Sequence, residues 1–536
     1  MNGRGVGQAA PVAGALLLAG ALQAWSLAWP WDGLWARGEP VAGLQILSLA
    51  ALLGLLRPAT SARAAFGRGW LWATAWLGCT FWWLFVSMHR YGGLPAPLAV
   101  LGVLALAGAL ALYYGLAAAL FWRWREARLR WRLPAFVALW TLAELARGTL
   151  LTGFPWGAGG YAQVDALAPL APWVGVYGLG AASAALALLA VEGLGGLVNR
   201  PGWNRPSGAA RAVKALPLAL AALLCWPGVG RLSAPLIPVW TEPTGQLSVV
   251  LLQGNIPQDE KFERGLGVPL ALDWYDAQAR TALARDGARL VVAPETAIPL
   301  LPRQLPPDWW PGLKRAVAAS PSALMIGLPL GGAQGGYTNS VVSLLPGAGP
   351  VQRYDKHHLV PFGEFIPPLF RWFTDLMRIP LGDFDRGALA QPPLDWAGQR
   401  IAPNICYEDL FGEELARGFA DPAQAPTVLV NVSNIAWFGD TIAIDQHRQI
   451  SRLRALELQR PMLRATNTGA TVAIDHLGRV THALPRLTRA ALDAEVEGRA
   501  GLTPYARWAG RFGLWPLAGL CLLALALAWR QGRARP

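Results

Sequence analysis

The sequence carries little charge for its length. Of its 536 residues only 15% are charged, whereas 54% are hydrophobic and 27 are tryptophan. This excludes an ordinary soluble protein, in which about a quarter of the residues are charged. Acidic residues are scarcer than basic residues, and the net charge is +13. The basic residues collect in short loops and form no basic face interleaved with aromatic residues, so we expect no nucleic-acid partner.

Histidine and cysteine are scarce as well. The six histidines lack the spacing of zinc ligands, and the pair at His357 and His358 is typical of a polar loop. We therefore expect no metal site, and we expect no cofactor. The chain has four cysteines, no internal repeat and no low-complexity linker.

Long apolar runs are abundant instead. A helix needs roughly 20 apolar residues to cross a bilayer core of about 30 Å. Runs of about this length occupy 11–30, 39–56, 69–88, 96–121, 133–153, 168–194, 214–230 and 512–529. The first run resembles a signal peptide, because Arg4 precedes it and small residues near Ala21 and Ala24 resemble a cleavage site. Since seven more runs follow, we favour a retained helix and predict eight spans.

The loops between the runs predict a topology. Lysine and arginine in short loops stay on the cytoplasmic side, and basic residues follow every even-numbered span. These are Arg57, Arg63 and Arg68; Arg123, Arg125, Arg128, Arg130 and Arg132; Arg200, Arg205, Arg211 and Lys214; and Arg530, Arg533 and Arg535. The pattern places both termini in the cytoplasm and the segment 231–511 in the periplasm of a bacterium with two membranes. We therefore expect a membrane domain at 1–230 with spans 1 to 7, a periplasmic catalytic domain at 231–511, and span 8 with a cytoplasmic tail at 512–536.

The segment 231–511 has the pattern of an α/β domain. Short β-rich runs occur at 247–253, 289–295, 322–329, 427–434 and 470–478, and helical stretches lie between several of them, as at 268–286 and 442–460. Strands that alternate with helices predict a layered α/β domain.

One cysteine of this segment raises a chemical question. Three cysteines, Cys79, Cys225 and Cys521, lie in predicted spans, so Cys406 is alone in an oxidising compartment. A lone cysteine is commonly a small core residue. A free thiol that persists in such a compartment more often has a chemical role. At this point both interpretations of Cys406 stay open.

A nucleophilic thiol needs a base and a positive charge for the oxyanion. Glu295 follows the apolar strand of "VVAPETAIP", and Lys356 and Glu364 lie in "RYDKHHLVPFGEFIP". Singly, a glutamate after a strand is usually a helix cap or solvated, and a lysine in a polar loop is usually a surface charge. Together with Cys406, which follows the β run "RIAPNICYE", they form a Glu, Lys, Cys series at three strand ends.

These three stretches, in this order, resemble the nitrilase superfamily, whose Glu, Lys, Cys triad lies on an αββα sandwich. Further motifs are "TGFPW" at 152–156, "QGNIPQ" at 253–258, "VPFGEFIP" at 360–367 and "RALELQRPMLRATNTG" at 454–469. With the eight spans, these motifs resemble the membrane-bound apolipoprotein N-acyltransferase family over almost the whole chain.

The resemblance implies a reaction. Members transfer a fatty acyl chain from a phospholipid to the α-amino group of the S-diacylglyceryl-cysteine of a bacterial apolipoprotein, through a thioester on the enzyme and with ping-pong kinetics. It implies Cys406 as nucleophile, Glu295 as general base and Lys356 as oxyanion stabiliser. It also implies supporting or substrate-binding roles, which fall on Glu364, Tyr407, Glu408, Phe262, Asn339 and Trp437. The sequence departs from the family at Phe262, where tryptophan is expected, at Phe365, where tyrosine is common, and at Ile435, where aspartate is usual.

Charges within the spans add one more candidate. Glu144 and Arg147 are three residues apart on a predicted helix, close enough to pair. Such charges are often functional, although a structural ion pair between helices is the alternative. The tryptophans of "FWWLF" at 81–85 are typical of interfacial anchors, and Trp437 is a candidate for the lining of a lipid entrance.

Three functional hypotheses remain from the sequence. The first is the phospholipid-dependent N-acyltransferase, whose partners are a phospholipid donor, a diacylated apolipoprotein and membrane lipid. The second is a membrane-tethered amidase with the same triad and water as the acceptor. The third is a transporter or scaffold without catalysis, against which the intact Glu295, Lys356 and Cys406 argue. We expect a monomeric, multi-pass protein of the bacterial inner membrane.

Overall fold

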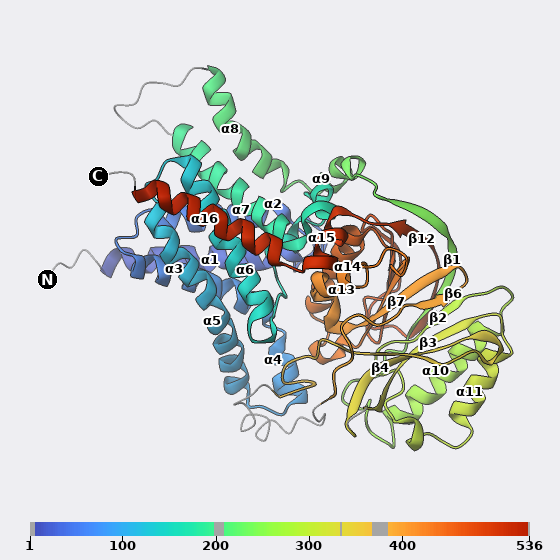
Figure 1. Cartoon of the computed structure of the whole chain (residues 1–536). Coiled ribbons are helices and arrows are strands. Elements are labelled where there is room, and N and C mark those ends of the chain that lie inside the picture. Colours follow the sequence, from blue (N-terminus) through green and yellow to red (C-terminus); the bar gives the residue numbers. More distant parts are fainter. Residues whose placement is uncertain (1–5, 198–207, 333–334, 367–383, 534–536) are drawn as a thin grey trace. The chain divides into compact units, whose positions relative to one another are not determined.

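The structure is a computed structural model that describes residues 6–197, 208–332, 335–366 and 384–533 (Figure 1). Contacts divide the chain into two compact units. The helical unit comprises Met1–Leu84, Pro97–Ile237 and Leu514–Pro536, and the sheet unit comprises Phe85–Ala96 and Pro238–Gly513.

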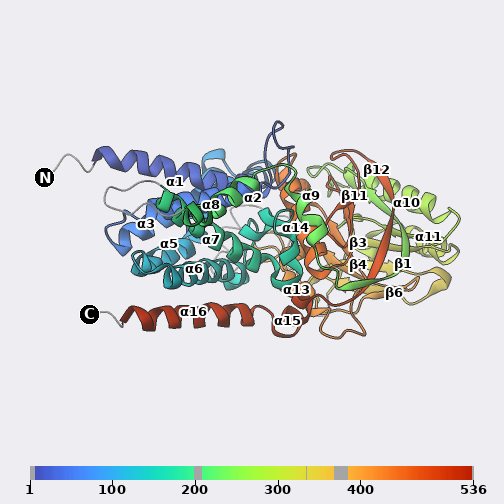
Figure 2. The same cartoon turned by 90° about the horizontal axis from the view of Figure 1, so that it is seen from above.

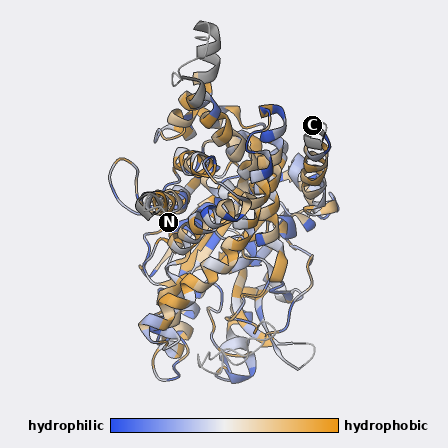
Figure 3. Cartoon of the chain, turned by 90° about the vertical axis from the view of Figure 1, so that its left-hand side faces the viewer, coloured by the Kyte–Doolittle hydropathy of each residue, from blue (hydrophilic) through white to orange (hydrophobic). Residues whose placement is uncertain are grey.

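The helical unit has a helix at each of the eight predicted spans. Its long helices are α1 Val6–Leu27, α2 Ala42–Leu56, α3 Ala62–Phe81, α5 Ala96–Phe121, α6 Leu129–Thr149, α7 Ala171–Leu197, α8 Gly208–Leu223 and α16 Trp515–Arg533. Hydrophobic residues run along most of them (Figure 3). A hydrogen-bonded helix satisfies its own backbone polar groups, as a lipid environment requires.

Fewer helices are long and apolar enough to cross a membrane than the eight that the sequence predicts. Within the described residues, four helices are long and apolar enough to cross, or up to six if each of two bent pairs counts as one span. The helix α2 has only 15 residues, and α8 has 16 with Pro217 inside. The count of eight therefore stays a prediction. The basic residues Arg200, Arg205 and Arg535, and Arg4 before the first span, lie outside the described residues.

Glu144 and Arg147 pair as their spacing predicted. The Arg147 guanidinium lies 3.5 Å from the Glu144 carboxylate, and both side chains are buried. Arg147 also donates to the carbonyls of Phe154 and Trp156, at 2.6 and 2.8 Å, and Glu144 accepts from the amide of Gly159 at 2.9 Å. The pair thus holds the end of α6 to the chain that follows it, including part of the "TGFPW" motif, which favours the structural interpretation of these charges.

The sheet unit contains two six-stranded sheets. The first has the order β12-β1-β2-β3-β4-β5, with β1 Thr241–Gln253, β2 Leu290–Val292, β3 Ala323–Gly331, β4 Tyr337–Leu344, β5 Gln352–Asp355 and β12 Ala490–Gly501. The second has the order β11-β10-β9-β8-β7-β6, with β6 Leu394–Trp396, β7 Gln399–Ile405, β8 Val428–Ser433, β9 Met462–Thr466, β10 Val472–Ile474 and β11 Val480–Ala483.

The alternation of side chains along the strands builds a four-layer sandwich. In β1, Leu247, Val249 and Leu251 pack between the two sheets. Val250 and Leu252 point the other way, against a core shared with α10 Gly267–Leu283 and α11 Trp309–Ala318. The second sheet is covered by α13 Gly412–Arg417, α14 Ala443–Leu458 and α15 Pro504–Phe512. Figures 1 and 2 show α10 and α11 on one side of the strands and α13 and α14 on the other. The predicted αββα architecture is confirmed.

Strand direction brings the functional side chains to one edge. The strands β1, β2 and β3 are parallel, and β5 runs with them because β4 is antiparallel to both β3 and β5. In the second sheet β7, β8 and β9 are parallel. Glu295 and Lys356 follow β2 and β5, and Cys406 directly follows β7. Each lies just beyond the carboxyl end of a strand, the edge at which α/β sheets place their ligand sites.

Candidate active site

Cys406 occupies a strained turn at the end of β7. Its backbone φ is +53°, in the left-handed region, which costs a residue with a side chain on the order of 1–3 kcal/mol. Two buried side chains hold its carbonyl: the Asn431 amide donates to it at 3.1 Å, and the Nε2 of His447 lies 3.3 Å away. The short 3-10 helix η9 Cys406–Leu410 begins at this residue. The turn leaves the cysteine partly exposed, as a nucleophile requires.

A buried network joins Glu295, Lys356 and Glu364. The Lys356 ammonium lies 3.4 Å from the Glu295 carboxylate and 2.8 Å from that of Glu364. The side-chain amide of Asn339 donates to both carboxylates, each at 2.7 Å. Glu295 also accepts from the backbone N–H of Asn434 at 2.8 Å, and Glu364 from that of Val360 at 2.8 Å. These bonds fix both carboxylates and leave the ammonium between them.

The charges of this network act on the thiol. Burial raises the pKa of the Cys406 thiol to about 12, and the Glu295 carboxylate adds to that rise, while Lys356 and Ser433 oppose it. Burial alone would lower the pKa of the Lys356 ammonium, but Glu364, Glu295 and the cysteine outweigh burial and raise it. The resting site therefore holds a neutral thiol beside a charged lysine and a carboxylate.

Glu408 ties the two strand ends together. Its carboxylate accepts from the backbone N–H groups of Ile405 and His357, each at 2.6 Å, and from His358 at 3.2 Å. The hydroxyl of Tyr354 donates to it at 2.9 Å. Burial raises the pKa of Glu408 to about 7, against these donors and Lys356. One carboxylate thus binds the residues that precede Cys406 and the residues that follow Lys356.

A second buried network lies behind the cysteine turn. His447 Nε2 lies 2.8 Å from the Asp409 carboxylate, and Arg464 donates to the other Asp409 oxygen at 3.1 Å. Ser451 also bonds Asp409. Burial would raise the pKa of the Asp409 carboxyl, but His447 and Arg464 lower it below its usual range. Because an Arg464 N–H points at His447 Nδ1, at 3.2 Å, the proton of a neutral imidazole lies on Nε2, where it can reach the Cys406 carbonyl.

The other predicted residues differ in their exposure and in their contacts. Tyr407 is buried, with its ring 5.2 Å from that of Phe411. Trp437 is partly buried and meets the ring of Tyr91 edge-on at 5.7 Å. Phe262 is 38% exposed, and no contact joins it to the triad among the contacts the structure describes. Ile435, which departs from the aspartate of the family, is buried at the start of the 3-10 helix η10 Ile435–Phe438.

The site contains polar residues that the sequence analysis did not single out. Lys261 is 1% exposed, and its ammonium donates to the Glu295 backbone carbonyl at 3.4 Å. Burial lowers its pKa to about 8, and Glu295 opposes this. Asn434 joins the site through its backbone N–H, while its side chain binds Gln258 at 2.8 Å. A signal existed for Lys261, because it directly precedes Phe262, and for Asn434, because it is the last residue of the β run at 427–434.

The chain matches two domain families along most of its length. The family described as Apolipoprotein N-acyltransferase N-terminal domain matches residues 13–189, and the family described as Carbon-nitrogen hydrolase matches residues 250–505.

Two relatives of similar sequence are named apolipoprotein N-acyltransferase. An apolipoprotein N-acyltransferase of Verminephrobacter eiseniae is 56% identical over 518 residues, which span 93% of this chain and 92% of that protein. One of Ralstonia nicotianae is 45% identical over 499 residues, or 91% of this chain and 89% of that protein. A solved structure, Saccharomyces cerevisiae Nit3 of the nitrilase superfamily, is 14% identical with a TM-score of 0.36, and the match covers 48% of this chain and 91% of that one.

Proposed function

Because this chain belongs to the apolipoprotein N-acyltransferase family and contains a carbon-nitrogen hydrolase domain, we propose that it acylates bacterial apolipoproteins from a phospholipid donor. The chain is an acyltransferase of the carbon-nitrogen hydrolase superfamily. In the proposed reaction a fatty acyl chain moves to the α-amino group of the N-terminal S-diacylglyceryl-cysteine of the apolipoprotein.

The first half-reaction acylates Cys406. Glu295 takes the proton of the neutral thiol as the sulfur attacks the carbonyl carbon of the phospholipid ester. The Lys356 ammonium stabilises the oxyanion, a contribution typically worth 10²- to 10³-fold in rate. A sulfur–carbon bond forms, the ester carbon–oxygen bond breaks, and Glu295 returns its proton to the departing alkoxide of the lysophospholipid. The product on the enzyme is a thioester.

The second half-reaction passes the acyl group to the lipoprotein. The neutral amine attacks the thioester, and Glu295 now accepts a proton of the amine. The amide carbon–nitrogen bond forms as the carbon–sulfur bond breaks, and the proton returns to the cysteine. Exclusion of water around the thioester slows the competing hydrolysis that would make the protein an amidase-like hydrolase.

One observation carries this proposal: Glu295, Lys356 and Cys406 lie beyond the carboxyl ends of strands from two sheets, within one network of charges. Asn339 and Glu364 fix Glu295 and Lys356, and Glu408 fixes the cysteine turn to the lysine strand. We assign positioning roles to Asn339, Glu364 and Glu408. Tyr407, Phe262 and Trp437 remain proposed substrate-binding residues.

The apolar helices make this a membrane protein. We propose the bacterial inner membrane, with both termini cytoplasmic and the catalytic domain at 231–511 periplasmic. The basic loops of the sequence support this topology.

The direct test supplies both substrates. Purified full-length protein is incubated with phospholipid labelled in its acyl chain and with a diacylated lipopeptide, and the peptide is analysed by mass spectrometry. We expect a triacylated lipopeptide with the label on its amino terminus. Release of labelled free fatty acid without acylated peptide would instead identify a hydrolase that uses water.

A further inference from the structure

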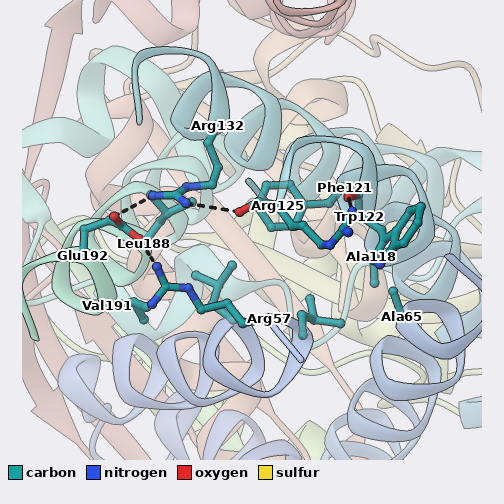
Figure 4. A pocket seen from close by; sticks show the side chains of 12 residues that line it. Arg57, Ala65, Ala118, Phe121, Trp122, Arg125, Arg132, Leu188, Val191 and Glu192 are labelled. Atoms are coloured by element: carbon teal, nitrogen blue, oxygen red, sulfur yellow. Dashed lines mark hydrogen bonds and ion pairs between the residues drawn. The ribbon is translucent and has the colours of Figure 1, made fainter. Parts of the chain in front are cut away.

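A small pocket lies in the helical unit at the end formed by the C-termini of α2, α5 and α7 and the N-termini of α3 and α6 (Figure 4). Its charged lining residues are Arg57, Arg125, Arg132 and Glu192, and the rest of the lining is apolar or aromatic, with Leu53, Phe121 and Trp122 among it. The guanidinium groups of Arg57 and Arg132 thus face the one carboxylate, while that of Arg125 adds a third positive charge to the lining.

Glu192 is shared between two of these arginines. Its carboxylate lies 2.6 Å from the Arg132 guanidinium and 3.2 Å from that of Arg57. Arg132 also donates to the backbone carbonyl of Arg125 at 3.2 Å. Arg125 itself lies over the ring of Trp122 at 4.0 Å and pairs with Glu126, which is 82% exposed. An ion pair so exposed to water contributes little, so the pocket keeps an excess of positive charge.

Donor groups of this cluster remain unused. The Nε of Arg132 is buried and has no hydrogen-bond partner among the described residues. Arg57 bonds Glu192 through one guanidinium nitrogen and is 44% exposed. A buried donor without a partner is costly. A guanidinium presents five N–H donors in a fork that matches the oxygens of a phosphate.

The surroundings of the pocket favour a lipid phosphate over a free one. The pocket holds about 20 Å³, room for about one water-sized group, so a phosphate would lie at the mouth with one oxygen inside, toward the buried Nε of Arg132. The helix α5 leads away from it, and Leu112, Leu116 and Leu120 on α5 are 51%, 54% and 48% exposed. These leucines form an apolar path for an acyl chain, and basic pockets between membrane helices bind anionic headgroups.

We infer that the pocket formed by Arg57, Arg125, Arg132 and Glu192 binds the phosphate of an anionic phospholipid at a site separate from the acyl-transfer chemistry. The phosphate bonds the free donors of Arg57 and Arg132, and one acyl chain lies along α5. The bound lipid stabilises the packing of α2, α6 and α7, because Arg57, Arg132 and Glu192 come from these three helices. The topology proposed above puts this end of the unit on the cytoplasmic side.

The test measures thermal unfolding of delipidated full-length protein in a neutral detergent. Dioleoyl phosphatidylglycerol is the anionic probe, dioleoyl phosphatidylcholine has the same chains without net charge, and inorganic phosphate tests the free anion. We expect phosphatidylglycerol to raise the Tm saturably, since a ligand of the folded state stabilises it. Phosphatidylcholine and millimolar phosphate leave the Tm unchanged. An equal response to both lipids, or a response to inorganic phosphate that matches that of the lipid, overturns the inference.

Variants separate a lipid site from an ion pair that only locks helices. Arg132→Gln raises the apparent Kd for phosphatidylglycerol by about 10-fold, in line with the loss of one charged hydrogen bond. Glu192→Gln removes the competing carboxylate and lowers that Kd. The control Arg63→Gln changes an exposed arginine at the same end of the unit. It leaves the Kd for phosphatidylglycerol unchanged. If Arg132→Gln does not fold, Glu192→Gln still decides: an unchanged or weaker response to the lipid identifies a purely structural pair.

Discussion

At the scale of single residues, Cys406 lies between a charge that favours its thiolate and a charge that opposes it. Lys356 lowers the pKa of the thiol, while burial and Glu295 raise it, and the result is a pKa of about 12. The thiol is therefore protonated throughout the range from pH 6 to 9. A neutral thiol needs a base at the moment of attack, which is the role proposed for Glu295.

Replacement of Glu295 separates acidity from catalysis. Glu295→Gln removes a negative charge beside the sulfur, so the thiol pKa falls and the thiolate fraction rises at alkaline pH. The same change removes the base, so acyl transfer from phospholipid slows by at least about 10²-fold. The measurement pairs the rate of Cys406 alkylation by iodoacetamide from pH 7 to 10 with the rate of acylation, in a background where Cys79, Cys225 and Cys521 are alanine.

Lys356→Met is the matched control for that experiment. It removes the positive charge, so the thiol pKa rises further and alkylation slows, and acyl transfer falls because the oxyanion loses its partner. The two variants thus move alkylation in opposite directions and acylation in the same direction. Parallel changes in both rates for Glu295→Gln would show that Glu295 only shapes the site.

The sequence predicted some of these residues better than others. Glu295, Lys356 and Cys406 could be identified because each follows a β run, and strand ends converge at one edge of the fold. Lys261 follows no strand, and nothing in its neighbours shows that its stem is buried. The partners of the Cys406 carbonyl, Asn431 and His447, come from a strand and a helix that only the folded sheet brings together.

At the scale of elements, two strand ends from different sheets depend on one side chain. Glu408 accepts from Ile405 beside the nucleophile and from His357 and His358 beside the lysine. Glu408→Gln replaces one acceptor oxygen by a donor that faces these N–H groups. We expect acyl transfer to fall by about 10- to 100-fold, with faster hydrogen exchange at residues 356–360 and 404–411.

The control for this prediction is a nearby glutamate. Glu414 pairs with the side chain of His358 at 3.0 Å and is partly exposed, so Glu414→Gln removes the same charge nearby but no bond from a carboxylate to the backbone N–H groups of the two strand ends. It leaves the exchange of both segments as in the wild type. Normal activity and normal exchange in Glu408→Gln would show that the two strand ends hold their positions without this carboxylate.

Helices and strands could be predicted from the sequence where apolar residues recur at the spacing of a helix or a strand. The predicted helices at 268–286 and 442–460 are α10 Gly267–Leu283 and α14 Ala443–Leu458, and the predicted strand at 247–253 is the end of β1. The strand β12 Ala490–Gly501 was not predicted. It is an edge strand, and its sequence alternates acidic and basic residues with small ones, so an apolar run is absent.

At the scale of the whole molecule, the basic loops predict which parts face the cytoplasm. A reporter enzyme that is active only outside the cytoplasm is expected to work when fused near residue 400 and to fail when fused near residue 128. The physical reason is that arginines at 123–132 resist translocation. Measured activities in the reverse order would invert the topology and place the catalytic domain away from the proposed apolipoprotein acceptor.

The central claim is that Cys406 carries the acyl group between two substrates. The measurement incubates the full-length protein with labelled phospholipid and no acceptor, followed by mass spectrometry of the peptide that contains Cys406. We expect a fatty acyl thioester on this residue that neutral hydroxylamine cleaves and that an added diacylated lipopeptide discharges. Cys406→Ala abolishes both label and product, Cys406→Ser nearly so, and alanine at Cys79, Cys225 and Cys521 leaves both intact. Acyl label or triacylated product formed by Cys406→Ala would contradict the account.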